Sequence, residues 1–233
     1  PMMTSYSGIY IHYPEELKTH SRISYDHRVT KELFKRLPKH DFYYQQFLPS
    51  FTNWMPLYWE GYTQTTRYTY QIDTRIGEEK MWSNLKSNVR TNIRKAETLF
   101  KFDNGSYDQF WEALELSCQT RNKKNPYRRE VLSRIYHALH PQGRCDLRVV
   151  RNIESNDIEA GIMLVNDRNS CFYICGFFME SSKNMHPFSM LMWESIKTSK
   201  QEIFDFEGSM IKDIEGFFRT FGVQLVPHFK IWK

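Results

Sequence analysis

The chain has 233 residues, of which 40% are hydrophobic and 16% are aromatic, so it can bury the core of one large domain or two small ones. A formal net charge of +5 permits an anionic partner without requiring one. The sequence has no apolar run of about 18 residues, so no transmembrane segment is expected. No signal peptide is recognisable, and the four cysteines lack metal-binding or redox spacing, which predicts a cytoplasmic protein with reduced, buried thiols.

The first hundred residues begin abruptly. Residues 1–8 are typical neither of a disordered tail nor of a protein start, so the chain is expected to begin inside a domain. A short strand is expected over 9–13, a helix over 22–37 and a strand over the aromatic residues 41–51. Alternation in Arg67-Tyr68-Thr69-Tyr70-Gln71-Ile72-Asp73 predicts a further strand.

Residues 78–99 show the clearest helical pattern. Their apolar residues recur at spacings of three and four: Trp82, Leu85, Val89, Ile93, Ala96 and Phe100. Basic residues line one border of this stripe at four-residue spacing: Lys86, Arg90 and Arg94. Asn84, Asn88 and Asn92 line the other border. Glu97 is the only acid between Lys86 and Lys101, which favours contact with an anion, and a solvated helix face is the alternative.

The second half of the chain has a regular order of predicted elements. Helices are expected over 106–121 (with Ser106 as the cap), 128–139, 187–199 (opened by Pro187) and 211–221. Strands are expected over 145–150, 158–165, 170–178, 203–207 and 224–232. Within 203–207, alternation would place Phe204 and Phe206 on the core face, and Asp205 and Glu207 together on the opposite face. Gly208-Ser209 ends this strand, and acids at a strand end are a common way to build a site.

From residue 106 onward the order of elements is that of the GNAT acyltransferase fold, and three motifs extend the likeness. Trp82-x-x-Leu85-x-x-Asn88-x-Arg90-x-x-Ile93-Arg94-Lys95-Ala96 resembles a helix of the Fem-type and BioF2-like acyltransferases. That group includes the bacterial peptidyltransferases that build peptidoglycan bridges. Arg67-Tyr68-Thr69-Tyr70 resembles the strand before that helix. Residues 204–209, Phe217-Phe218-x-x-Phe221-Gly222 and Pro227-x-Phe229 resemble the C-terminal end of the family.

The resemblance implies an α/β (α+β) fold with two GNAT-like halves. Residues 1–100, including the linking helix 78–99, would form a first half truncated at its N-terminus. Residues 101–233 would form a complete second GNAT-like domain.

The resemblance also implies an activity, the transfer of an acyl or aminoacyl group to an amine. The acceptor would be anionic, for example a nucleotide-linked cell-wall precursor, and the donor substrate would be acyl-CoA or aminoacyl-tRNA. GNAT enzymes hold the pyrophosphate of CoA on backbone N–H groups of a glycine-containing loop. The equivalent residues here, 180–186, include no glycine, and Pro187 lacks an N–H group, which disfavours CoA.

Candidate site residues follow from this activity. Glu207 or Asp205 would accept the proton of the amine or orient it, and Tyr173 or Tyr68 would donate to the developing oxyanion. The predicted anion and substrate contacts are Arg67, Tyr68, Lys86, Arg90, Arg94, Lys95 and Ser209. Structural alternatives are a carboxylate that caps nearby backbone or pairs with Arg67 or Arg219, and tyrosines that belong to the core.

Two other functions are consistent with the sequence, namely a CoA-dependent N-acetyltransferase acting on a small amine and a non-catalytic GNAT-fold binding module. A DNA-binding module is disfavoured because the basic residues lie in one helix rather than across a broad face. No metal site is expected, since His137 and His140 have no third ligand nearby in sequence.

Overall fold

The computed structural model describes residues 6–233, and the chain divides into two compact units. The first unit runs up to Thr69 and also includes Leu225–Lys233, and the second is Tyr70–Gln224. This division does not coincide with the predicted boundary after residue 100, because the two helices that precede that residue pack into the core of the second unit. The interpretation of residues 1–100 as part of an earlier GNAT-like half stays a prediction.

The first unit contains the helices α1 (Thr19–Lys35) and α2 (Met55–Trp59), the strand β1 (Tyr44–Gln46), most of β2 (Thr63–Asp73) and β8 (Gln224–Trp232). Strand β1 pairs antiparallel with β8, and the core is aromatic, with Phe47, Phe51, Leu57, Tyr62 and Ile231 all buried.

Two predicted strands of the first unit were wrong or too long. Residues 9–13 form no strand, and the isolated bridge nearest to them joins Ser7 to Phe47. The strand expected over 41–51 is reduced to β1, and Pro49 has no N–H group with which to continue the ladder. The helix expected over 22–37 is present as α1, which begins three residues earlier and ends at Lys35.

The second unit is built on a mixed sheet. Its strands β3 (Phe100–Asn104), β4 (Cys145–Asn152), β5 (Ile158–Asn166) and β6 (Ser170–Phe178) form an antiparallel meander. Strand β7 (Ile203–Asp205) lies between β6, to which it is parallel, and the end of β2, to which it is antiparallel. Strand β7 is therefore an inner strand.

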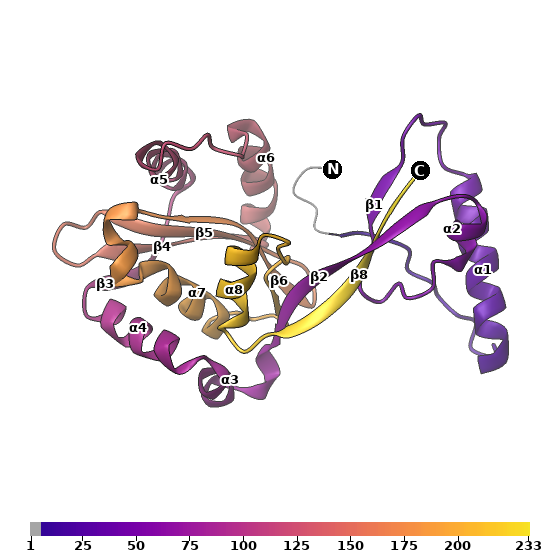
Figure 1. Cartoon of the computed structure of the whole chain (residues 1–233), viewed down its shortest axis with the longest axis horizontal. Helices are drawn as coiled ribbons and strands as arrows, with labels where there is room; N and C mark the ends of the chain where they lie inside the picture. Colours follow the sequence, from indigo (N-terminus) through magenta and orange to yellow (C-terminus); the bar gives the residue numbers. More distant parts are fainter. Residues whose placement is uncertain (1–5) are drawn as a thin grey trace. The chain divides into compact units, whose positions relative to one another are not determined.

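Helices cover both faces of this sheet (Figure 1). One face carries α5 (Tyr107–Thr120) and α6 (Arg129–Leu139), where Phe110 packs edge-on against Phe177 at 5.3 Å. The other face carries α3 (Glu78–Asn84), α4 (Ser87–Glu97), α7 (Pro187–Lys197) and α8 (Lys212–Arg219), whose apolar residues form the main core with Phe204 and Phe206. Three short 3₁₀ helices complete the unit: η1 (Thr74–Ile76), η2 (His140–Gln142) and η3 (Glu180–Met185).

The helix expected over 78–99 is two helices, α3 and α4. Leu85 and Lys86 have extended backbone angles, with ψ of 142° and 140°, and the Lys86 N–H group donates to the carbonyl oxygen of Thr220 at 2.9 Å. The apolar stripe continues across the break because both helices pack on the same core. The following strand β3 was not predicted, whereas α5, with Ser106 as its N-cap, and all later α-helices and β-strands were.

All four cysteines (Cys118, Cys145, Cys171 and Cys175) are unpaired and buried. Burial raises the pKa of Cys145 and of Cys171 to about 12, so at pH 8 only about one thiol in 10⁴ is ionised at each position. We expect Cys145 and Cys171 to react with iodoacetamide at least about 10³ times more slowly in the folded protein than in urea-unfolded protein. Peptide mapping after timed alkylation measures this ratio, and fast labelling of the folded protein would contradict the burial.

Candidate active site

The two parallel strands of the second unit separate after three residues. Strand β7 pairs with Ser170, Cys171 and Phe172 of β6 and ends at Asp205. The chain then stays beside β2, where the Phe206 N–H group donates to the carbonyl oxygen of Tyr70 at 2.9 Å. Strand β6 continues to Phe178 and carries a β-bulge next to Tyr173. A bulge beside a divergence of strands is a frequent place for a site.

Asp205 lies inside the protein and not on an open face. It is fully buried; its Oδ2 atom accepts a hydrogen bond from Gln71 Nε2 at 2.7 Å, and Oδ1 accepts one from the Glu207 N–H group at 2.8 Å. The prediction that Asp205 and Glu207 share one face of a strand was wrong, because the strand ends at Asp205 and the carboxylate folds back on the following turn. Asp205 therefore matches the alternative prediction, a carboxylate that caps a nearby backbone N–H group.

Glu207 has an unusual backbone conformation. Its φ of +58° is in the left-handed region, which costs a residue with a side chain on the order of 1 kcal/mol. The hydrogen bond from its N–H group to Asp205 holds the turn in place. Strain of this kind persists where the surrounding structure fixes it and is concentrated at functional sites. Its half-buried carboxylate is close enough to Tyr127, Tyr173 and Cys175 for its charge to disfavour their ionisation.

Tyr173 is held among aromatic rings, edge-on to Phe218 at 5.9 Å and to Phe188 at 6.4 Å. Burial raises its pKa well above the usual value, with smaller contributions from Tyr127, Cys175 and Glu207. The phenol therefore stays protonated at any physiological pH and can donate a hydrogen bond. This is the property that the predicted oxyanion contact requires.

Tyr127, which lies between α5 and α6, was not predicted as a site residue. Burial raises its pKa as well, followed by the charges of Cys175 and Glu207. Its N–H group donates to Asn125 Oδ1 at 2.9 Å, and the amide group of Asn125 in turn donates to Glu115 Oε1 at 2.8 Å. The irregular, charged segment around it has no periodicity, so only the fold could place this phenol beside Tyr173.

The remaining predicted residues of the second unit have contacts of their own. Arg90 donates to the carbonyl oxygen of Ser83 at 3.1 Å and to that of Leu85, so it binds the C-terminal end of α3. The Arg94 guanidinium lies 5.5 Å from the Trp82 ring centroid. Ser209 Oγ accepts from the N–H group of Ile211 at the start of α8.

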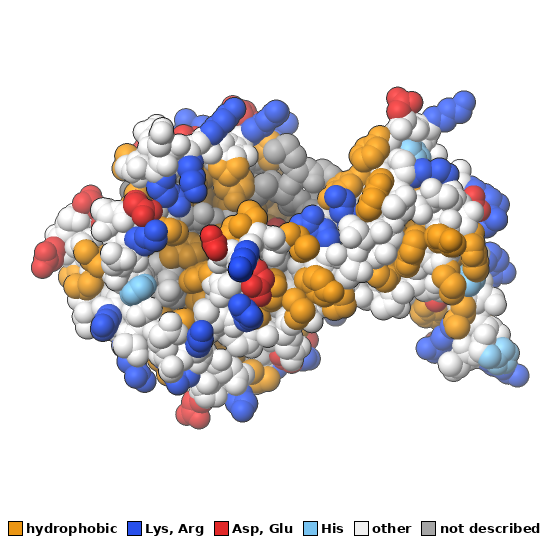
Figure 2. All heavy atoms as spheres, viewed as in Figure 1, with side chains coloured by type: hydrophobic (Ala, Val, Ile, Leu, Met, Phe, Trp, Pro, Cys, Tyr) orange, Lys and Arg blue, Asp and Glu red, His pale blue; other side chains and the backbone are white. Residues whose placement is uncertain are grey.

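Lys86 and Lys95 are exposed. Arg67 and Tyr68 belong to the first unit, and anion binding by any of these basic residues stays a prediction. In Figure 2, positive and negative side chains are interspersed over the visible face, with no broad basic surface on it.

In the segment between β6 and α7, backbone N–H groups donate to carbonyl oxygens of the same segment. Within η3 and its flanks, the Ser182 N–H group donates to the Met179 carbonyl oxygen and the His186 N–H group to that of Lys183, both at 3.2 Å. His186 is left-handed, with φ of +61°, and Pro187 has no N–H group. Ser182, His186 and Pro187 therefore offer no free backbone N–H group to a pyrophosphate.

Within residues 6–233, no three or more His, Cys, Asp and Glu side chains are arranged to hold a metal ion. The same residues include no helix long and apolar enough to cross a membrane.

Comparisons with known proteins agree with this architecture. Residues 83–206, more than half of the chain, match the family model described as acetyltransferase (GNAT) domain. The structure of FemX aligns with a TM-score of 0.63 at 12% identity over 75% of this chain and 67% of that one. The C-terminal domain of a putative lysylphosphatidylglycerol synthetase from Agrobacterium fabrum gives 0.60 at 11% identity, over 82% and 67%. No curated protein matches. The predicted GNAT-like α/β fold and its likeness to Fem-type proteins are thereby confirmed.

Proposed function

Because the chain belongs to the family of acetyltransferase (GNAT) domains, which confirms it as an acyltransferase, we propose that it transfers an acyl or aminoacyl group to an amine of an anionic acceptor. The observation that carries the proposal is the cluster of Glu207, Tyr173 and Tyr127 where β6 and β7 separate. It combines one carboxylate with two phenols that stay protonated. A proton acceptor and neutral hydrogen-bond donors are what acyl transfer to an amine needs.

Each group has a part in the reaction. The amine nitrogen attacks the donor carbonyl carbon and forms the new C–N bond, while Tyr173 donates a hydrogen bond to the carbonyl oxygen as it gains charge. Glu207 accepts the proton that the nitrogen loses. When the C–S bond of a thioester or the C–O bond of an ester breaks, that proton passes to the leaving group. Cys175 is not a nucleophile here, because burial raises the pKa of its thiol and keeps it protonated.

The segment from Met179 to Pro187 supports an ester donor such as aminoacyl-tRNA over acyl-CoA. The N–H groups of Ser182 and His186 donate within this segment and Pro187 has none, so a CoA pyrophosphate would have fewer backbone donors than a free loop offers. One structural neighbour is named for a product in which a lysyl group is joined to an anionic lipid, which is consistent with aminoacyl transfer to an anionic acceptor.

Two measurements on the purified protein test the choice of donor. In calorimetric titration, we expect no saturable binding of acetyl-CoA up to about 1 mM, the weak end of ordinary substrate affinity. Radiolabelled aminoacyl-tRNA incubated with the protein and a cell-wall precursor extract should lose label to a small, acid-stable product. Tight acetyl-CoA binding would favour a CoA-dependent N-acetyltransferase acting on a small amine. The absence of both acetyl-CoA binding and aminoacyl transfer would favour a non-catalytic GNAT-fold module.

A further inference from the structure

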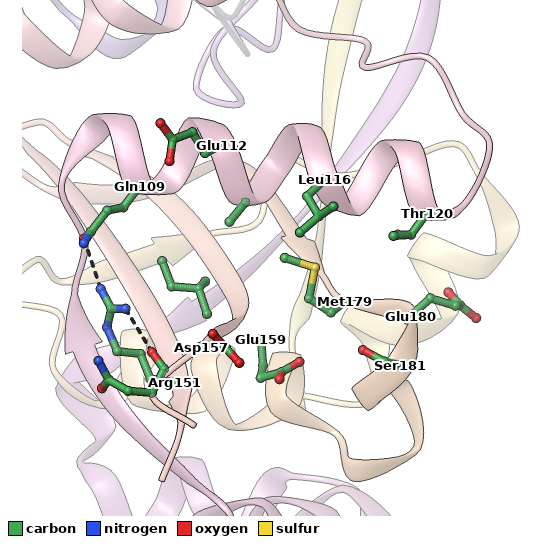
Figure 3. A pocket seen from close by; sticks show the side chains of 13 residues that line it. Gln109, Glu112, Leu116, Thr120, Arg151, Asp157, Glu159, Met179, Glu180 and Ser181 are labelled. Atoms are coloured by element: carbon green, nitrogen blue, oxygen red, sulfur yellow. Dashed lines mark hydrogen bonds between the residues drawn. The ribbon is translucent and has the colours of Figure 1, made fainter. Parts of the chain in front are cut away.

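A cavity of about 580 Å³ lies between α5, the β4–β5 hairpin and the end of β6 (Figure 3). Its apolar part includes Ala113 and Leu116 from α5, Ile158 from β5 and Met179 after β6. In Figure 3, Leu116 and Met179 point toward one another across it. The volume is within the range of about 300 to 1,000 Å³ that is usual for small-molecule sites.

The charges that line the cavity are mostly negative, although the protein as a whole is positive. Glu112 comes from α5, and Asp157 and Glu159 come from the hairpin. Within residues 6–233, the carboxylates of all three lack an ion-pair partner, and the buried Oε2 atom of Glu159 lacks a hydrogen-bond partner. The fourth acid, Glu180, pairs with Lys183 at 3.1 Å. A buried carboxylate oxygen without a donor is costly, so a donor supplied by a ligand would be stabilised there.

Arg151, the single basic residue of the lining, does not offset these acids. Its side chain is only 12% exposed, and it donates to Asp103 at 3.2 Å, to Gln109 at 3.0 Å and to the Asn156 carbonyl oxygen at 3.3 Å. Figure 3 shows it at one end of the cavity, between Gln109 and the hairpin. Because its donors are directed at the wall, it is poorly placed to hold the carboxylate of a zwitterion.

We propose that this cavity binds a linear aliphatic diamine or polyamine. Glu159 would accept hydrogen bonds from one ammonium group, and Asp157 and Glu112 would balance the charge of the other ammonium group. The alkyl chain would lie on Leu116 and Met179. The proposal goes beyond acyl transfer at the divergence of β6 and β7, because it concerns binding alone and needs no donor.

Calorimetric titration with spermidine and 1,5-diaminopentane, without any acyl donor, tests this site. We expect saturable binding of one molecule, weakened at least about tenfold between 20 and 200 mM salt because the attraction is screened. 1-Aminopentane should bind about tenfold more weakly, and the dianion glutarate should not bind. Lysine, a zwitterion, should bind more weakly than 1,5-diaminopentane. Tighter binding of lysine would mean that Arg151 is available and would overturn the proposal.

Matched variants locate the binding. Glu159→Gln and Asp157→Asn should each weaken spermidine binding about tenfold, since each removes a charge-assisted contact. Glu97→Gln, at an exposed position on α4 outside the cavity, removes the same charge and should leave the affinity unchanged. Asp157 is exposed, so its variant keeps the test valid if Glu159→Gln unfolds. Equal weakening by all three variants, or no saturable binding, would overturn the proposal.

Discussion

Replacing Gly222 with alanine is expected to lower the free energy of unfolding by about 2 to 4 kcal/mol. Gly222 follows α8 with φ of +71°, where a side chain is strained. An added Cβ atom would also lie 2.6 Å from the carbonyl oxygen of Asn84 and 2.9 Å from its carbonyl carbon. These are backbone atoms at the end of α3, so relief requires a helix to move rather than a side chain to rotate. Urea unfolding followed by circular dichroism measures the change.

Gly216 provides the control, because it lies inside α8, the helix that Gly222 follows, and its surroundings are open. No atom is within 4 Å of a Cβ atom added at this position. Gly216→Ala should therefore raise the free energy of unfolding by about 0.5 to 1 kcal/mol through helix propensity. A Gly222→Ala variant as stable as the parent protein would contradict the close approach of α8 to α3.

The same contact explains what could not be read from the sequence of residues 78–99. Spacing of apolar residues reports which face is buried, and that face is continuous through Leu85, so a single helix was predicted. The break depends on the Lys86 N–H group, which binds Thr220, a residue brought there by the fold. The later elements were predictable because each is periodic and bounded by a cap or turn. Strand β3 was not, although Phe100 and Phe102 alternate with Lys101 and Asp103, because it is only five residues long and Phe100 also continues the apolar stripe of the preceding helix.

The candidate site, too, could be predicted from the sequence only in part. A turn signal after alternating residues predicted Asp205 and Glu207 as candidates, but their different surroundings depend on Gln71 across the sheet and on the left-handed backbone at Glu207. Tyr173 could be named as one tyrosine among 14, and only its burial beside Tyr127 distinguishes it. Neither the bond between Gln71 and Asp205 nor the position of Tyr127 leaves a local sequence pattern.

Glu207→Gln is expected to reduce kcat of the proposed transfer by about 10² to 10⁴, the usual contribution of a positioned proton acceptor. Glutamine has the same shape and accepts a hydrogen bond, but it cannot take the proton of the amine. Substrate affinity and stability should change little, since the N–H group of residue 207 still donates to Asp205. Initial rates at saturating substrates, together with urea unfolding of the same samples, separate kcat from stability.

Asp205→Asn distinguishes a positioning residue from the proton acceptor. Asparagine keeps an Oδ1 atom for the Glu207 N–H group, and the Gln71 amide can rotate to accept from the new Nδ2 group, so the turn should persist. We expect about a tenfold loss of kcat with an unchanged pH dependence, because the group that titrates during the reaction is still present. If Asp205→Asn were inactive while Glu207→Gln kept its rate, proton acceptance would belong to Asp205, and the strained turn at Glu207 would serve only to close the site.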